Sequence, residues 1–213
     1  PRLQKIIKKN LNLEKFRENL EYIASTYPHV VLELFTMHGF PSETKEEAMM
    51  TLDFIKSIKW LHFPYVFVVR VYPNTDMEKL ALAHGAKQDD IHRSDNLAFH
   101  ELPDTLPFEK SFTIKYQADF FNNYFLSKER LIHVLPHQMK ALTEDEIVQK
   151  YNSYLPKDIH SFAELLEFFG IKKEELKVNG CLEDSKVEVP GLYEKMKAHF
   201  PRKKIRDDAF RIL

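Results

Sequence analysis

The chain has 213 residues, of which 44% are hydrophobic and 30% charged, the proportions of an ordinary globular protein. A formal net charge of −1 excludes a general electrostatic affinity for nucleic acid or for an anionic membrane. The single cysteine, Cys181, excludes a disulfide framework and a zinc site built on several thiolates, and it indicates a reducing, cytoplasmic compartment. No apolar run reaches the roughly 20 residues of a transmembrane helix, so no membrane span is predicted.

The first predicted elements are a helix and a strand. Apolar residues at helical spacing predict a helix over residues 13–27, with Asn12 or Asn10 as its N-cap. The segment "HVVLELFTM" (29–37) then reads as a strand that is apolar on both faces apart from Glu33. This pattern is typical of a strand covered on both sides in a parallel α/β sheet.

The next elements repeat the same order. Thr44 and Glu47 fit a capping box, which predicts a helix over residues 45–58 with one apolar face. A second strand is predicted in "PYVFVVRVYP" (64–73), and a short helix in "TDMEKLALAHG" (75–85). Short connections between helices and strands predict consecutive βα units and a parallel sheet.

The second part of the chain is predicted to be helical, with a boundary between residues 1–100 and 101–213. Residues 86–110, rich in Asp, His and Pro, are expected to form the connecting loop. A long helix is expected after them, broken near Pro136. Thr143 with Glu146 and Ser161 with Glu164 fit capping boxes that predict two further helices, and Gly170 is the expected end of the second. A weaker pattern predicts another helix in "PGLYEKMKAHF" (190–200).

The turn after the first strand, "HGFPSET", has two interpretations. Ligands of parallel α/β folds bind at the carboxyl ends of the strands, and this turn lies at such an end. Gly39 would let the backbone approach a ligand, and the following helix would present free N–H groups. Alternatively, these residues serve only the turn and the helix cap. His38 could contact a cofactor or substrate, or it could make a hydrogen bond within the turn.

Three segments carry a resemblance to a known family. The segment "GFPSET" resembles the Gly-x-Pro-Gly-Glu-Thr turn after the fifth barrel strand of many radical S-adenosylmethionine (SAM) enzymes. The segment "VYPNTDMEKLA" resembles their Tyr-Pro-Gly-Thr-x-Leu segment after the sixth strand. The segment "PRLQKIIKKN" is similar to the Ser-x-Arg-x-Leu-x-x-Ile-x-Lys pattern after the fourth strand. The resemblance covers residues 1–90, in the order and spacing of the family, and is greatest for cobalamin-binding proteins similar to the anaerobic magnesium-protoporphyrin IX monomethyl ester oxidative cyclase.

The resemblance implies an α/β fold, the second half of a six-stranded (β/α)6 partial TIM barrel, followed by a mostly α-helical C-terminal region. It implies SAM, an iron–sulfur cluster and cobalamin as cofactors of the full-length protein, and a small-molecule substrate of tetrapyrrole-like type. The family holds its cluster in a CxxxCxxC loop, which this chain lacks. We therefore expect a piece of a longer polypeptide that is inactive alone, holds no cofactor by itself, and pairs with the upstream part or with another copy.

The family's adenine-contacting Gly-x-Ile-x-Gly pattern corresponds to Phe35, Met37 and Gly39, with Phe35 and Met37 replacing the first glycine and the isoleucine. Arg70 and Tyr72, two residues apart on the second strand, share one face and would lie near SAM or substrate. Together with His38, these are the predicted cofactor-binding residues. Ser42 and Asn74 replace glycines of the two turn motifs, and asparagine tolerates left-handed backbone conformations.

Other features have simpler interpretations. Ten histidines include His84, His92 and His100 at wide spacing, and His133 and His137 four residues apart, but a metal site is less expected than solvated or hydrogen-bonded side chains. The basic segment 201–213 reads as a solvated helix face or linker, and Cys181 as incidental. An alternative to the enzyme is a non-catalytic α/β and helical domain that binds another protein through its helical part.

Overall fold

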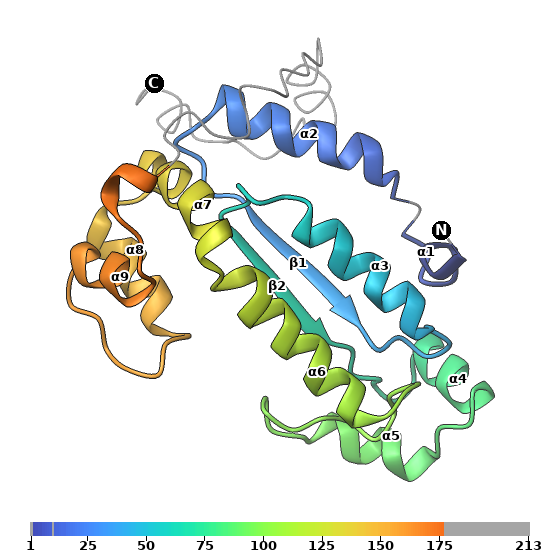
Figure 1. Ribbon diagram of the computed structural model, residues 1–213. Helices are drawn as coiled ribbons and strands as arrows, with labels where there is room; N and C mark the ends of the chain where they lie inside the picture. The colour runs from blue at the N-terminus through green and yellow to red at the C-terminus, as the bar shows by residue number, and fades with distance from the viewer. Residues whose placement is uncertain (1, 10, 177–213) are drawn as a thin grey trace, which may run out of the picture.

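The computed structural model describes residues 2–9 and 11–176 (Figure 1). The elements in chain order are α1 (Arg2–Ile6), α2 (Leu13–Thr26), β1 (Glu33–His38), α3 (Lys45–Lys56), β2 (Phe63–Val68), α4 (Asp76–Ala83), α5 (Gln88–Asp95), α6 (Lys110–Phe120), the π-helix η1 (Phe121–Phe125), α7 (Lys128–Ala141), α8 (Glu144–Asn152), α9 (Phe162–Phe168) and the 3₁₀-helix η2 (Lys173–Glu175). The predicted α/β class is confirmed, with mostly helices.

The sheet has two parallel strands in the described part of the chain. β1 and β2 pair in register from Glu33 opposite Phe63 to His38 opposite Val68. The two strands with their following helices agree with two βα units, and a partial barrel is not confirmed. β2 ends at Val68, earlier than the predicted end at Pro73.

One face of the sheet is covered by helices. Leu34 and Val66 pack against a core in which α3 and α6 meet, and α2 packs beside them through Leu20 and Ala24. In Figure 1, α3 runs along β1 and α6 runs along β2, and the two helices are in contact, with the Tyr116 hydroxyl donating to the Ala48 carbonyl over 3.0 Å. The opposite face is open, because the described residues supply helices to one side only. The prediction that the first strand is covered on both sides is therefore wrong for this chain.

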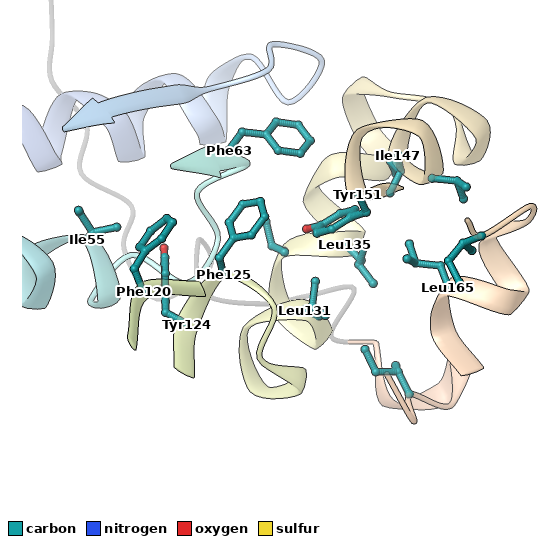
Figure 2. Packing of buried hydrophobic residues seen from close by; sticks show 14 of the residues in the cluster. Ile55, Phe63, Phe120, Tyr124, Phe125, Leu131, Leu135, Ile147, Tyr151 and Leu165 are labelled. Carbon is teal, nitrogen blue, oxygen red and sulfur yellow. The ribbon is translucent and has the colours of Figure 1, made fainter. Parts of the chain in front are cut away.

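The helical region shares the core of the sheet. The largest cluster of buried apolar residues joins Leu52 of α3 and Phe63 of β2 to Phe125, Leu135 and Tyr151. Figure 2 shows this packing, in which Tyr151 of α8 points toward Phe63 and Phe125. Residues from both predicted regions, 1–100 and 101–213, therefore lie in one hydrophobic core.

The N-cap residues read from the sequence predicted most helix starts correctly. Asn12, not Asn10, caps α2, and Thr44 and Thr143 each form a reciprocal capping box with the glutamate three residues later. Ser161 caps α9 through the N–H of Glu164, as expected. The expected helix at 190–200 and the basic segment 201–213 lie outside the described residues.

Two predictions about the middle of the chain are wrong. The region 86–110 contains α5, which is stabilised by the burial of Ile91 against Val71 and Ala81 rather than by an apolar stripe. The long helix is not broken at Pro136, which lies inside α7 with its ring buried in the core. The break comes earlier, where Ser127 accepts a hydrogen bond from the N–H of Arg130 and starts α7 afresh.

Candidate functional site

The turns after β1 and β2 lie at the same edge of the sheet. Pairing continues one residue beyond β2, since the Val69 N–H donates to the His38 carbonyl over 2.9 Å. The turn that begins at Gly39 and the segment that begins at Arg70 therefore leave the sheet side by side. This is the edge at which parallel α/β proteins bind ligands.

The open face of the sheet carries an aromatic and apolar surface. Phe35 stacks on Tyr65 and Phe67, with ring centroids 5.0 and 5.9 Å apart. Phe35 and Met37 keep 56% and 50% of their surface exposed. Exposed apolar surface of this kind commonly marks a binding face. Phe35 and Met37 therefore lie together on the open face of the sheet.

His38 points to the other face of the sheet. Its ring is fully buried against Tyr116 and Phe108, with centroids 4.2 and 6.3 Å away. Neither ring nitrogen has a hydrogen-bond partner among the described residues, so the predicted hydrogen bond within the turn is wrong. Burial lowers the pKa of His38 to about 4, which keeps the ring neutral. His38 lies away from the open face that Phe35 and Met37 line.

Glu43 closes the turn at Gly39. Its buried carboxylate accepts hydrogen bonds from the N–H groups of Gly39 and Phe40, the latter over 3.0 Å. Burial raises the pKa of Glu43 to about 7 against the opposing effect of these two hydrogen bonds. These N–H groups are already used, so they are not free for a ligand. For the N–H groups of Gly39 and Phe40, the interpretation in which the residues serve only the turn and the helix cap is therefore correct.

The start of α3 is tied to the N-terminal segment. Arg2 donates to both carboxylate oxygens of Glu47 over 3.0 and 2.6 Å, and to the Ser42 carbonyl over 2.6 Å. Ser42 has φ = 73°, the left-handed region that the glycine of the family motif would occupy without strain. Two of the three segments that carry the family resemblance, "PRLQKIIKKN" (1–10) and "GFPSET" (39–44), are therefore in direct contact.

The turn after β2 repeats this arrangement. Asn74 has φ = 62°, as expected for the residue replacing a glycine. Its N–H donates to Glu78 over 2.7 Å, and Thr75 caps α4. Glu78 thus follows Asn74 by the same four positions that separate Glu43 from Gly39. The hydrogen bonds that Glu43 and Glu78 accept from the turn N–H groups were not predicted, although the shared four-residue spacing was readable in the sequence.

Arg70 is committed to the protein's own backbone. Its guanidinium donates to the carbonyls of Leu97 and Ala98, the latter over 2.5 Å, and holds the segment after α5 against the end of β2. Tyr72 is about half exposed. Arg70 is therefore a positioning residue for the segment at Leu97 and Ala98, while the Tyr72 ring remains accessible beyond the carboxyl end of β2.

The described residues hold no metal-binding group. No cluster of three or more His, Cys, Asp or Glu side chains that could bind an ion is found between residues 2 and 176. His84 bonds the Leu80 carbonyl over 2.9 Å and His92 contacts Gln88 over 3.1 Å, as expected for hydrogen-bonded histidines. These residues do not fit an iron–sulfur cluster, whose usual ligands are cysteine thiolates.

Replacing Gly39 by alanine tests why this turn needs glycine. Gly39 has φ = +88°, and a Cβ atom would lie 2.8 Å from Leu106 Cδ2. We expect Gly39→Ala to cost about 2–3 kcal/mol of unfolding free energy in urea denaturation, from backbone strain and the displacement of Leu106. Gly85→Ala is the matched control, because φ is +91° with nothing within 4 Å. It should cost about 1 kcal/mol. Equal costs would remove Leu106 from the explanation.

One curated protein gives a partial match to the chain. The tRNA-2-methylthio-N(6)-dimethylallyladenosine synthase of Pelotomaculum thermopropionicum is 29% identical over 92 residues, which are 42% of this chain and 20% of that enzyme. The chain therefore spans about a fifth of the length of this relative. No protein-family model matches the chain, and no solved structure matches it.

Among the described residues, no helix combines the length and the apolar character needed to span a membrane.

Proposed function

We propose that this chain is the SAM- and substrate-facing C-terminal portion of a radical SAM enzyme. The partial similarity to a radical SAM methylthiotransferase supports this family. The observation that carries the proposal is the open apolar face formed by Phe35, Met37 and Phe67 at the carboxyl ends of parallel strands. In a closed or partial barrel this face lies toward the interior, where ligands bind.

The residues on this face fit the adenine part of SAM. Phe35 and Met37 supply an apolar wall, and Gly39 follows the strand directly at the same edge of the sheet. Tyr72 stands at the same edge and is accessible to cofactor or substrate. The bound cofactors would supply hydrogen-atom abstraction from an unreactive C–H bond, while residues of this chain would orient SAM and exclude water.

The finer assignment extends the proposal to the cobalamin-dependent, oxidative cyclase-like group. It rests on the order and spacing of the three motif segments. The cluster-binding cysteines, and a cobalamin domain, would lie in the upstream part of the same polypeptide, so the isolated chain is inactive. The substrate is a small, tetrapyrrole-like molecule in a cytoplasmic enzyme. The substrate named for the synthase is not carried over, because the match covers 20% of that enzyme.

The test uses the full-length gene product, purified without oxygen. A CxxxCxxC motif upstream and a broad visible absorption that bleaches with dithionite are expected, as for a protein-bound iron–sulfur cluster. A product that lacks the motif and stays colourless after reconstitution with iron and sulfide would overturn the proposal. It would favour the interaction domain instead.

The role of the open face has its own measurement. Met37→Asp in the full-length protein should weaken SAM binding about tenfold or more in equilibrium dialysis, since a charge replaces part of the apolar wall. Met50→Asp is the control, because Met50 is similarly exposed but lies on α3. Unchanged SAM affinity in both variants would place the cofactor elsewhere.

A further inference from the structure

A recess lies along the edge of β2 that does not pair with β1. It has a volume of about 690 Å³ and is lined by residues 64–68 of the strand and by three phenyl rings, Phe120, Phe121 and Phe125, where α6 continues into η1. Figure 2 labels Phe120 and Phe125. The volume lies within the range of small-molecule sites in proteins. Met37 does not line the recess, which therefore extends beyond the surface proposed to contact adenine.

The backbone of β2 has unpaired groups at this edge. The N–H groups of Phe63 and Val69 donate to carbonyls on the β1 side, over 3.2 and 2.9 Å. Because backbone groups alternate between the two sides of a strand, the odd-numbered residues of β2 pair with β1. Val66 and Val68 therefore direct their N–H and C=O groups to the opposite side. No further strand pairs with them in the part of the chain that the structure describes.

These groups alternate donor and acceptor along the edge. Their order is the Val66 N–H, the Val66 carbonyl, the Val68 N–H and the Val68 carbonyl. A flat heteroaromatic ring that carries an N–H beside a carbonyl or a ring nitrogen presents a matching pair. Such a ring can donate to the Val66 carbonyl and accept from the Val68 N–H, while the phenyl rings of the recess supply aromatic contacts.

The charged side chains of the recess favour an uncharged ligand. With histidine counted as neutral, these side chains are Arg70 and Glu101, whose charges cancel. The Arg70 guanidinium is held by the carbonyls of Leu97 and Ala98, and the Glu101 carboxylate accepts the Ala98 N–H over 2.8 Å. No lysine is found among the described residues that line the recess. A phosphate or carboxylate would therefore lose water without gaining a free cation there.

An extended peptide is the other class of ligand that pairs with a strand edge. A peptide carries a second row of N–H and C=O groups on its far side. The wall that α6 and η1 supply offers one polar side chain, Gln117, beside its three phenyl rings. Most of that second row would stay unpaired against this wall, at a cost in free energy. A ring with a single polar edge avoids this cost.

We propose that this recess binds an uncharged, flat heteroaromatic compound that carries a hydrogen-bond donor and an acceptor at neighbouring ring positions. The polar edge of the compound pairs with Val66 and Val68, and its ring contacts the phenyl side chains of α6 and η1. None of the three motif segments lines the recess, so this binding site does not depend on the proposed function.

The probe is carbostyril, an uncharged bicyclic lactam, and its binding to the complete chain is followed by heteronuclear NMR of the backbone amides. We expect a saturable shift of the Val66 and Val68 signals with a dissociation constant of about 1 mM or lower. N-Methylcarbostyril has lost the N–H donor and should bind about tenfold more weakly, since one hydrogen bond to the strand edge is missing.

A matched pair of variants places the probe in the recess. Gln117→Trp should abolish carbostyril binding, because the indole takes up space in the recess that Gln117 lines. Ile114→Trp is the control and should keep the affinity, because Ile114 lies one turn earlier on α6, is 60% exposed and does not line the recess. Far-ultraviolet circular dichroism checks that both variants are folded. If Gln117→Trp does not fold, the comparison of the two lactams on the unchanged chain still decides.

Four results would overturn the assignment. The absence of a saturable shift would mean that the recess does not take this class of compound. Equal affinity for the two lactams would mean that the ring does not pair with the strand edge. Shifts at Phe35 and Met37 in place of Val66 and Val68 would put the probe on the open face. Tighter binding of the blocked peptide acetyl-Val-Thr-Val-amide than of carbostyril would make the recess a site for strand addition.

Discussion

Arg130→Met should lower the free energy of unfolding by about 2–4 kcal/mol, because three buried carbonyls lose a charged donor. Arg130 is 1% exposed and donates to Phe125 O, Leu61 O and His62 O over 2.9, 2.7 and 3.0 Å. These bonds join η1 to the start of β2. The guanidinium also lies 5.1 Å from the ring centroids of Tyr124 and Phe125. Urea denaturation monitored by far-ultraviolet circular dichroism measures the loss.

Arg93→Met is the matched control for this change. Arg93 pairs with Asp90 and Asp104, but its side chain is 60% exposed, and exposed ion pairs contribute little. The control should stay within about 1 kcal/mol of the unchanged chain. If Arg130→Met stays within the same limit, the three hydrogen bonds of Arg130 do not contribute measurably to holding the helical region against the sheet.

Lowering the pH from 7 to 4 should unfold the chain. Burial lowers the pKa values of His38, His62 and His137 to about 4, below the ordinary value of 6.5. Their stabilising effect is complete above pH 6.5, where the unfolded chain also holds neutral histidines. It is lost as the pH falls toward 4, because the unfolded chain binds protons that the folded chain does not.

Glu43 opposes this trend. Its pKa of about 7 in the folded chain lies above the ordinary carboxyl value, so its contribution is greatest below about pH 4.5 and is lost as the pH rises to 7. Between its unfolded-state and folded-state pKa, each group changes the free energy of unfolding by up to about 3 kcal/mol. The loss from three histidines on acidification therefore exceeds the gain from one carboxyl group. The net loss on acidification is comparable to the whole stability of a domain. Fluorescence of the buried Trp60 follows the transition.

His38→Phe separates this mechanism from general acid effects. The phenyl ring fits the aromatic surroundings of Tyr116 and Phe108 and removes two ring nitrogens that have no partner in the described structure. The acid transition should move to lower pH, with higher stability at neutral pH. An unchanged midpoint would show that His38 is not among the groups that drive unfolding.

Local sequence signals predicted the parts of this fold that local physics controls. The caps at Asn12, Thr44 and Thr143 were readable because a side-chain oxygen and a backbone N–H within three residues satisfy each other. The left-handed turn residue Asn74 was readable for a similar reason. Positions three or four apart decide these features, whatever surrounds them.

The candidate site was predicted only in part. Strand alternation alone places Phe35 and Met37 on one face and His38 on the other. The prediction that all three residues contact the same cofactor therefore conflicted with the sequence pattern itself. Arg70 gave no such signal, because its partners, the carbonyls of Leu97 and Ala98, lie far along the chain in a region predicted to be a loop.

The sequence by itself determined the α/β class, the alternation of helix and strand from α2 to α4, and the three segments that resemble radical SAM enzymes. Only the tertiary structure decided that Arg130, in a segment predicted simply to be helical, lies buried against the residues that precede β2, and that one sheet face stays open. The physical reason is the sequence separation over which the deciding interactions act. Caps and turns depend on neighbours along the chain, whereas burial depends on which distant segments arrive at the same place, as Leu61 and His62 do at Arg130.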